Sequence, residues 1–237
     1  MSVPSSSPGI SVCIPAYNEE ATIESAVAQV EAVLQGMSCS YEIIVCDDAS
    51  VDGTKEIIRQ LSLRNPHLRP IFHEKNKGIR ATFEELYANA TQEAVFLLPS
   101  DLEWPPEILP SLVNRLADAD IVIAARINKH YGISRSIVSA VFNLIPGILF
   151  GISITDAGAV KLVRREIIRD MRIISQSPFS EAERIVRAVR AGYRLESMPT
   201  VTRQRSAGVS HGVRLKVLVA AVADVLRVWW DIRILGR

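Results

Sequence analysis

Hydrophobic residues follow two patterns that alternate along the first half of the chain. Short apolar runs predict buried strands, and apolar residues spaced three and four positions apart predict helices. The predicted strands cover 10–14, 41–46, 69–72, 94–98 and 121–124. The predicted helices cover 22–34, 52–63, 81–90 and 105–117. Because strands and helices alternate, the sequence predicts an α/β fold with a mostly parallel sheet and helices on both faces.

The pattern changes after Arg126. An uncharged stretch, 136–155, is just long enough to cross a bilayer, but Asn143, Pro146 and Gly147 within it favour a broken, surface-lying or buried helix. The elements predicted to follow are a strand at 159–163, a helix at 181–191 and a strand at 194–197.

The C-terminal segment is apolar but interrupted by charges, which predicts an amphipathic helix. Trp229 and Trp230 near one end favour a helix lying in a membrane interface, and packing on the domain's own core is an equal alternative. The expected organisation is a polar, flexible N-terminus over 1–9, one domain over 10–212 and the amphipathic helix over 213–237.

Composition narrows the class of protein. The 237 residues include 27 Lys and Arg against 26 Asp and Glu, which gives no indication of nucleic-acid binding. Two of the cysteines, Cys13 and Cys46, fall in predicted buried strands, which suits reduced thiols. With no signal-peptide pattern at the N-terminus, the expected location is the cytoplasm. The four histidines show no zinc-like spacing.

Residues that could bind a ligand follow two of the predicted strands. The second strand runs into Asp47 and Asp48, at the sheet edge where α/β proteins bind ligands. Buried acids there are costly unless they hold a ribose, a base edge or a metal. Tyr17 and Glu19 follow the first strand and could contact a base. Asp52 is the expected N-cap of the next helix, and Asp47 a brace for the loop.

These segments, Pro15-Ala16-Tyr17-Asn18-Glu19 and Asp47-Asp48, resemble the GT-A glycosyltransferases of family 2. The resemblance implies a Rossmann-like GT-A fold with a C-terminal helical extension, and an inverting transfer of a hexose from a nucleoside diphosphate sugar. It also implies that Pro15, Tyr17, Glu19 and Asp48 lie at the nucleoside.

Residues 98–106 resemble the family's metal-binding Asp-x-Asp motif. Pro99 stands at the first Asp position, Asp101 at the second, and Glu103 at the place of a metal-proximal residue. The resemblance implies that Ser100 and Asp101 lie at the diphosphate, and that Asp101 and Glu103 hold Mg²⁺ or Mn²⁺, which needs only one or two protein carboxylates. The alternative is that Asp101 caps the helix beginning at Pro105.

Basic residues are expected around the phosphates. Lys77 lies in a segment that resembles the family's Asn-x-Gly turn, and Arg126 follows the fifth strand. Arg203 and Arg205 lie in a loop that resembles one able to close over a diphosphate. The alternative for Lys77 and for the loop is ordinary exposed basic residues.

The second half is expected to bind the acceptor. Glu183 matches a family acid on a helix facing the site, but Glu183 and Asp156 are weak candidates for a general base. The closest overall resemblance within the family is to dolichol- or polyprenyl-phosphate mannosyltransferases, through the run 101–107.

A phosphate acceptor is already ionised and needs no base. The expected acceptor is therefore a lipid phosphate, with the protein peripheral on the cytoplasmic face of a membrane or bound to a membrane-protein partner. The alternatives are transfer to a sugar hydroxyl of a polysaccharide or glycolipid, and a non-catalytic scaffold that binds nucleotide sugars.

Overall fold

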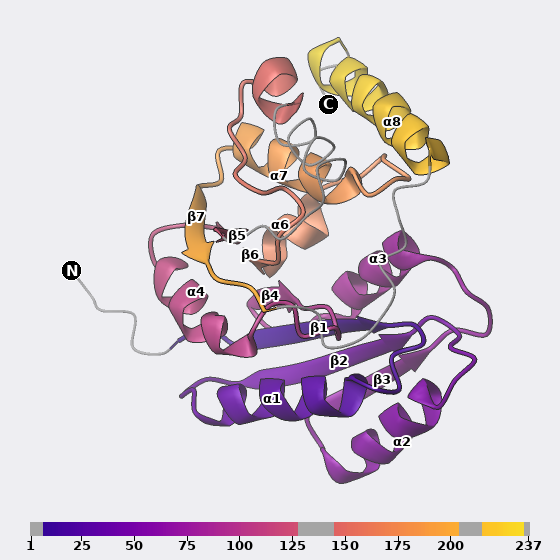
Figure 1. Ribbon diagram of the computed structural model, residues 1–237. Helices are drawn as coiled ribbons and strands as arrows, with labels where there is room; N and C mark the ends of the chain where they lie inside the picture. The colour runs from indigo at the N-terminus through magenta and orange to yellow at the C-terminus, as the bar shows by residue number, and fades with distance from the viewer. Residues whose placement is uncertain (1–6, 128–144, 204–214, 235–237) are drawn as a thin grey trace.

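The computed structural model describes residues 7–127, 145–203 and 215–234. Within them, one sheet has the strand order β3-β2-β1-β4-β6-β5-β7 (Figure 1). The strands are β1 (Ile10–Ala16), β2 (Tyr41–Asp47), β3 (Leu68–Phe72), β4 (Ala94–Leu97), β5 (Ile121–Arg126), β6 (Lys161–Arg164) and β7 (Leu195–Thr200). Only β6, among these strands, runs antiparallel to its neighbours, β4 and β5. The predicted mostly parallel α/β sheet is confirmed.

The helices connect these strands. They are α1 (Ile23–Gln35), α2 (Thr54–Arg64), α3 (Ile79–Asn89), the 3-10 turn η1 (Pro106–Ile108), α4 (Leu109–Arg115), α6 (Arg165–Asp170), α7 (Ser180–Arg190) and α8 (Leu215–Arg233). Residues 145–150 are also helical. In α1 the buried positions Ile23, Val27, Val30 and Leu34 share one face, as a helix packed on a sheet requires.

The central strands are buried on both faces. In β1, Val12 and Ile14 join the core cluster that includes α1, whereas Cys13 joins a second cluster with Leu86 of α3. This alternation places α1 and α2 on one face and α3 on the other, as Figure 1 shows. The loops after β1, β2, β3 and β4 therefore meet at one sheet edge.

The predicted strands and helices of the described residues are found with small shifts in their bounds. The helix α6 was not predicted, and residues 136–144 of the uncharged stretch lie outside the described residues. Asp52, the predicted N-cap of α2, lies one residue before the N-cap position, which Gly53 occupies. The Asp52 carboxylate still accepts a hydrogen bond from the first helical N–H, that of Thr54, at 3.0 Å. The predicted helix over 105–117 divides into η1 and α4, since Pro110 lies at the start of α4 and has no N–H for an unbroken helix.

The C-terminal helix packs on the domain with one face. Val225, Val228 and Ile232 are buried in the main core. Asp224 accepts hydrogen bonds from the backbone N–H groups of residues 176 and 177, both at 2.7 Å. Core packing, one of the two alternatives for this segment, is therefore observed. No helix in the described part of the chain has the length and apolar character to cross a membrane.

Candidate active site

The loops after β1 and β2 are joined by hydrogen bonds between their tips. Asn18 donates its backbone N–H to the Ser50 hydroxyl at 2.9 Å, and its side-chain oxygen accepts the Val51 N–H at 2.9 Å. The Glu20 carboxylate accepts the Gly53 N–H at 2.7 Å. The two loops therefore hold each other in place before any ligand binds.

Tyr17 is the predicted nucleoside residue with the most open position. Its side chain is 44% exposed, so the ring is accessible for stacking. Glu19 is partly buried and accepts a hydrogen bond from the Thr22 hydroxyl at 2.8 Å. Pro15 is buried, and its carbonyl accepts the Ser100 hydroxyl at 3.4 Å, which joins the first strand end to the loop after β4.

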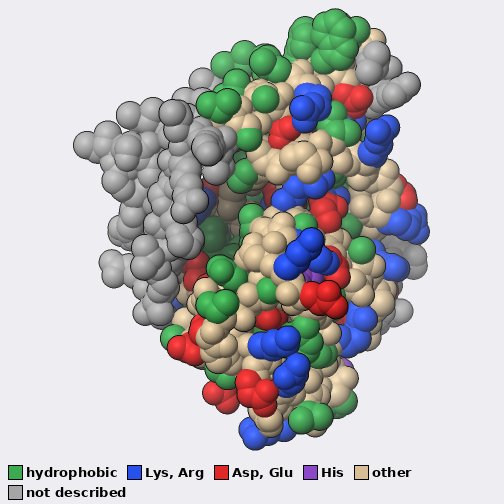
Figure 2. Space-filling model, turned by 90° about the vertical axis from the view of Figure 1, so that its right-hand side faces the viewer, with side chains coloured by type: hydrophobic (Ala, Val, Ile, Leu, Met, Phe, Trp, Pro, Cys, Tyr) green, Lys and Arg blue, Asp and Glu red, His purple; other side chains and the backbone are tan. Residues whose placement is uncertain are grey.

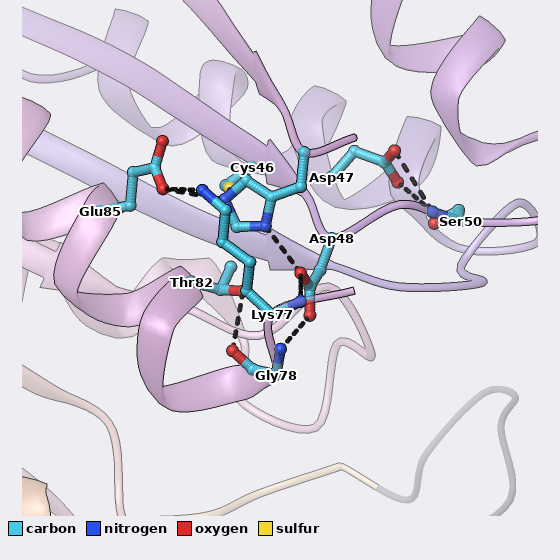
Figure 3. A network of polar contacts seen from close by, with 9 residues as sticks. Cys46, Asp47, Asp48, Ser50, Lys77, Gly78, Thr82 and Glu85 are labelled. Atoms are coloured by element: carbon cyan, nitrogen blue, oxygen red, sulfur yellow. Dashed lines mark hydrogen bonds and ion pairs between the residues drawn. The ribbon is translucent and has the colours of Figure 1, made fainter. Parts of the chain in front are cut away.

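Asp47 and Asp48 are both buried and both hold backbone. The Asp47 carboxylate accepts the Ser50 N–H at 3.3 and 3.4 Å. Asp48 accepts the N–H groups of Lys77 and Gly78 at 2.8 and 2.9 Å (Figure 3). Asp48, which was expected at the nucleoside, thus braces the turn before α3. Bracing of a loop was the role expected of Asp47.

His73 belongs to the same network and was not among the predicted site residues. Its Nδ1 lies 2.6 Å from Asp48 Oδ1, and its Nε2 lies 3.0 Å from Glu85 Oε2. Lys77 Nζ also donates to Glu85 Oε2, at 2.9 Å. One signal could have identified His73, because it follows β3 directly and the end of β3 lies beside Asp47 of β2.

The loop after β4 brings Asp101 and Glu103 together. Asp101 accepts the Glu103 N–H at 3.1 Å, and both side chains are nearly buried. Their hard oxygen donors suit Mg²⁺ or Mn²⁺, which can complete its coordination with diphosphate oxygens. Among the described residues, no cluster of three or more His, Cys, Asp or Glu side chains could hold a metal ion. Asp101 and Glu103 are thus the residues of this loop that could hold such an ion.

From the sequence, the Arg126 guanidinium is expected to contact a phosphate. In the structure this guanidinium contacts carboxylates of the protein. Its Nε and Nη2 donate to the two oxygens of Asp156 at 2.7 Å each, and Nη1 lies 3.3 Å from Glu103 Oε1. Its guanidinium also lies 4.8 Å from the centre of the Trp104 ring. Arg126 thus connects the end of β5 to the loop carrying Glu103, and its contacts favour a positioning role.

Glu183 is fully buried, with 0% of its surface exposed. Its carboxylate accepts the N–H groups of Ile174 and Ser175 at 3.1 and 2.8 Å and pairs with Arg187 at 2.8 Å. These contacts satisfy both carboxylate oxygens within the fold. They favour a structural role over the catalytic role expected from the sequence.

The start of the predicted basic loop passes beside the metal motif. The Arg203 N–H donates to the Glu103 carbonyl at 2.8 Å. The Arg203 side chain is exposed and reaches Glu107 and Gln29, both at 3.0 Å. Arg205 lies outside the described residues, so its predicted role stays a prediction.

Unusual backbone conformations gather in these same loops. The non-glycine residues with positive φ, within the described ranges, are Asn18, Ala49, Leu102 and Asp156. Each costs roughly 1–2 kcal/mol relative to ordinary backbone, less for Asn and Asp. Such strain persists where the surrounding structure enforces it, commonly at functional sites. Asn18, Ala49 and Leu102 lie in the loops after β1, β2 and β4, and Asp156 precedes β6 and binds Arg126.

Comparison with known proteins identifies the family. The model of glycosyl transferase family 2 matches residues 11–177. The chain belongs to glycosyl transferase family 2. The GT-A fold predicted from the sequence is confirmed with it.

Two curated relatives act on lipid phosphates, as their names state. The chain is 32% identical over 165 residues to the undecaprenyl-phosphate 4-deoxy-4-formamido-L-arabinose transferase of Aeromonas hydrophila, which covers 68% of this chain and 51% of that protein. It is 34% identical over 118 residues to the dolichol-phosphate mannosyltransferase of Pyrococcus furiosus, covering 49% of this chain and 33% of that protein. The chain spans about half the length of the first relative.

Two solved structures share the fold of this family 2 member. The mannosyltransferase PcManGT of Pyrobaculum calidifontis, in complex with GDP-Man and Mn²⁺, gives a TM-score of 0.66 at 21% identity over 94% of this chain and 66% of that one. Glucosyl-3-phosphoglycerate synthase of Mycobacterium tuberculosis, with Mn²⁺, UDP and phosphoglyceric acid, gives 0.70 at 20% identity over 94% and 78%. At these identities the likeness concerns the fold.

Proposed function

We propose that this protein transfers a sugar from a nucleoside diphosphate sugar, GDP- or UDP-linked, to a polyprenyl or dolichyl phosphate. The observation that carries the proposal is the match of 68% of the chain to a transferase named for undecaprenyl phosphate. A relative named for dolichol phosphate supports the same class of acceptor.

The donor would bind at the joined strand ends. Tyr17 is exposed for stacking on the base, and Glu19 can accept from base N–H groups. Lys77, with its side chain 41% exposed, is the accessible cation of the turn that Asp48 holds. Asp101 and Glu103 would hold a divalent ion, which when bound neutralises charge on the diphosphate.

A lipid phosphate acceptor agrees with the state of the candidate bases. Asp156 is bound to Arg126 through both oxygens, and Glu183 is satisfied by backbone N–H groups and Arg187. A hydroxyl acceptor needs a base that can take its proton in the transition state, whereas a phosphate is already ionised. The arrangement of these two acids therefore favours the phosphate.

The C-terminal helix supports a position at a membrane surface. Opposite its buried face, an exposed apolar stripe runs along α8; it consists of Val219, Val222, Ala223, Leu226 and Trp230. Hydrophobic side chains gather at the top of the face in Figure 2, at the height of α8 in Figure 1. The two acids in the described part of α8 contact the rest of the domain. Asp224 accepts backbone N–H groups, and Asp231 pairs with Arg187. Such a helix suits the boundary of anionic lipids.

The test is sugar transfer into a lipid product. Purified protein is incubated with polyprenyl phosphate, detergent, Mg²⁺ or Mn²⁺ and a panel of radiolabelled UDP- and GDP-sugars, and label in the organic phase is counted. We expect label with one donor, lost in Asp101→Ala and kept in Asp118→Ala, an exposed acid that precedes the amino end of β5. Donor binding without label would favour a hydroxyl acceptor or a non-catalytic scaffold.

A further inference from the structure

We propose that Trp104 is a positioning residue of the loop that carries Asp101 and Glu103. Its ring holds the guanidinium of Arg126, and Arg126 in turn sets the direction of the Glu103 carboxylate. Trp104 follows Glu103 directly in the chain and packs in the main core. The consequence for a bound ion rests on the proposed function, whereas the contact of ring, guanidinium and carboxylate does not.

The backbone of Glu103 is held separately from its side chain. Its N–H donates to Asp101 Oδ1 at 3.1 Å, and its carbonyl accepts the Arg203 N–H at 2.8 Å. The preceding residue, Leu102, has a φ of 57°, a conformation that the surrounding structure must enforce. These contacts fix the place of Glu103 in the loop, and the direction of its carboxylate depends on side-chain contacts.

One such contact comes from Arg126, whose guanidinium is bound along its edges. Nε and Nη2 donate to the two oxygens of Asp156 at 2.7 Å each, and Nη1 lies 3.3 Å from Glu103 Oε1. The two bonds to Asp156 lie along one edge of the planar group. Because they leave the group able to tilt about that edge, the third nitrogen keeps its direction only if the flat face is also held.

Trp104 holds that face. The Arg126 guanidinium carbon lies over the indole ring, 4.8 Å from its centre. Trp104 is 5% exposed, and the Arg126 side chain is 8% exposed. A cation is attracted to the face of a tryptophan ring, and the attraction is stronger where water is excluded. The ring therefore fixes the face of the guanidinium while Asp156 fixes its edge, and Nη1 stays directed at Glu103.

The indole N–H takes no part in this arrangement. In the part of the chain that the structure describes, Trp104 Nε1 is buried without a hydrogen-bond partner. An unpaired buried donor costs free energy, so the N–H is not what holds the ring in place. A phenylalanine ring also attracts a cation and has no N–H to leave unpaired. Phenylalanine should therefore replace Trp104 in this role, and an aliphatic side chain should not.

The contact itself is tested without any ligand, by NMR of the Arg126 Nε–H group, whose signal is assigned by its absence in Arg126→Lys. We expect the ring current of Trp104 to shift this signal. The shift should be kept in part in Trp104→Phe and lost in Trp104→Leu, which keeps an apolar side chain in the core. Leu112→Ala, at a fully buried position of α4, is the matched control for lost stability and should keep the shift. The same Arg126 signal in the native chain and in Trp104→Leu would overturn the proposal.

The effect on Glu103 is tested by binding of Mn²⁺ in the presence of UDP or GDP, followed by electron paramagnetic resonance of the ion. Trp104→Leu should weaken Mn²⁺ binding roughly tenfold, as expected when a group that orients a metal ligand is lost. Trp104→Phe and Leu112→Ala should bind as the native chain does. Equal binding by the native chain and Trp104→Leu, or an equal loss in Trp104→Phe or Leu112→Ala, would overturn the positioning role.

The two readouts separate this proposal from the proposed function, because neither requires turnover. A native chain that binds no Mn²⁺ with either nucleotide would contradict the ion site and with it the effect of Trp104 on ion binding, while the Arg126 signal still decides the contact. Mn²⁺ binding without sugar transfer by the native chain would contradict the proposed function alone.

Discussion

Gly78 holds a backbone conformation that other residues rarely adopt. Its φ of 84° and ψ of 159° fall in a region that is essentially restricted to glycine. A Cβ at this position would meet no heavy atom within 4 Å, so a side chain would be opposed by the backbone conformation alone.

Gly78→Ala should therefore lower the free energy of unfolding by about 1–3 kcal/mol and weaken nucleotide binding, because the turn held by Asp48 must change. Urea unfolding measures the first effect and calorimetry with UDP or GDP the second. Gly36→Ala is the matched control, since Gly36 has ordinary helical angles. An equal loss of stability in both variants would contradict this explanation.

A second prediction at the residue scale concerns Arg126, which pairs with Asp156. With its side chain 8% exposed and Asp156 2% exposed, the pair is buried and bidentate. Arg126→Met should lower the unfolding free energy by about 3–5 kcal/mol, because Asp156 would remain charged and buried.

The double variant Arg126→Met with Asp156→Asn should recover part of this loss, since it also removes the buried charge of Asp156. Arg169→Met, which breaks an exposed pair, should leave the unfolding curve unchanged. Urea unfolding of the four proteins decides between these outcomes. No recovery in the double variant would show that the stabilisation does not come from the charge pair.

At the scale of elements, Glu42 joins several strands at the edge opposite the site. It accepts from the Ser11 hydroxyl of β1 at 2.6 Å, from the Thr91 N–H before β4 at 2.7 Å and from Arg69 of β3 at 2.9 Å. Burial raises its pKa, but the hydrogen bonds from Ser11, Thr91 and Arg69 outweigh burial and hold the pKa below its ordinary value.

A folded-state pKa below the unfolded one means that ionised Glu42 stabilises the fold above the unfolded value, about 4.3. This stabilisation is lost as pH falls through the folded value. Glu42→Gln should therefore be less stable at neutral pH and lose less on acidification, as measured by unfolding free energy against pH. Glu56→Gln should follow the native curve. Parallel curves for the native chain and Glu42→Gln would contradict the assignment.

The alternation of elements could be predicted from sequence because each depends on local spacing, as in α1 and β1. The direction of β6 could not, since it is set by pairing with β4 and β5. The loops that meet at the site could also be predicted from the strand ends. Their internal partners could not: Asp156 reaches Arg126 across 30 residues, and this contact changes the expected role of the arginine.

At the scale of the whole molecule, α8 has apolar residues on two opposite faces. One packs on the core through Val225, Val228 and Ile232, and the other exposes Leu226 and Trp230. The second face lies on the outside of the molecule, at the top of Figure 2.

Replacing Leu226 and Trp230 by Ser should therefore reduce binding to vesicles of anionic lipid in a sedimentation assay, while the unfolding midpoint stays the same. Val228→Ala, on the buried face, should do the reverse: stability falls by about 1–3 kcal/mol and vesicle binding of the folded protein is kept. Unchanged vesicle binding in the Ser variant would remove the membrane role of this face.

The proposed acceptor is a phosphate on a lipid. The most direct measurement compares polyprenyl phosphate with polyprenol of the same chain length, each with the preferred radiolabelled nucleotide sugar and Mn²⁺, counting lipid-soluble label. We expect label with the phosphate and none with the alcohol, because Asp156 and Glu183, the candidate bases, are engaged within the fold. Equal or greater transfer to the alcohol would contradict it.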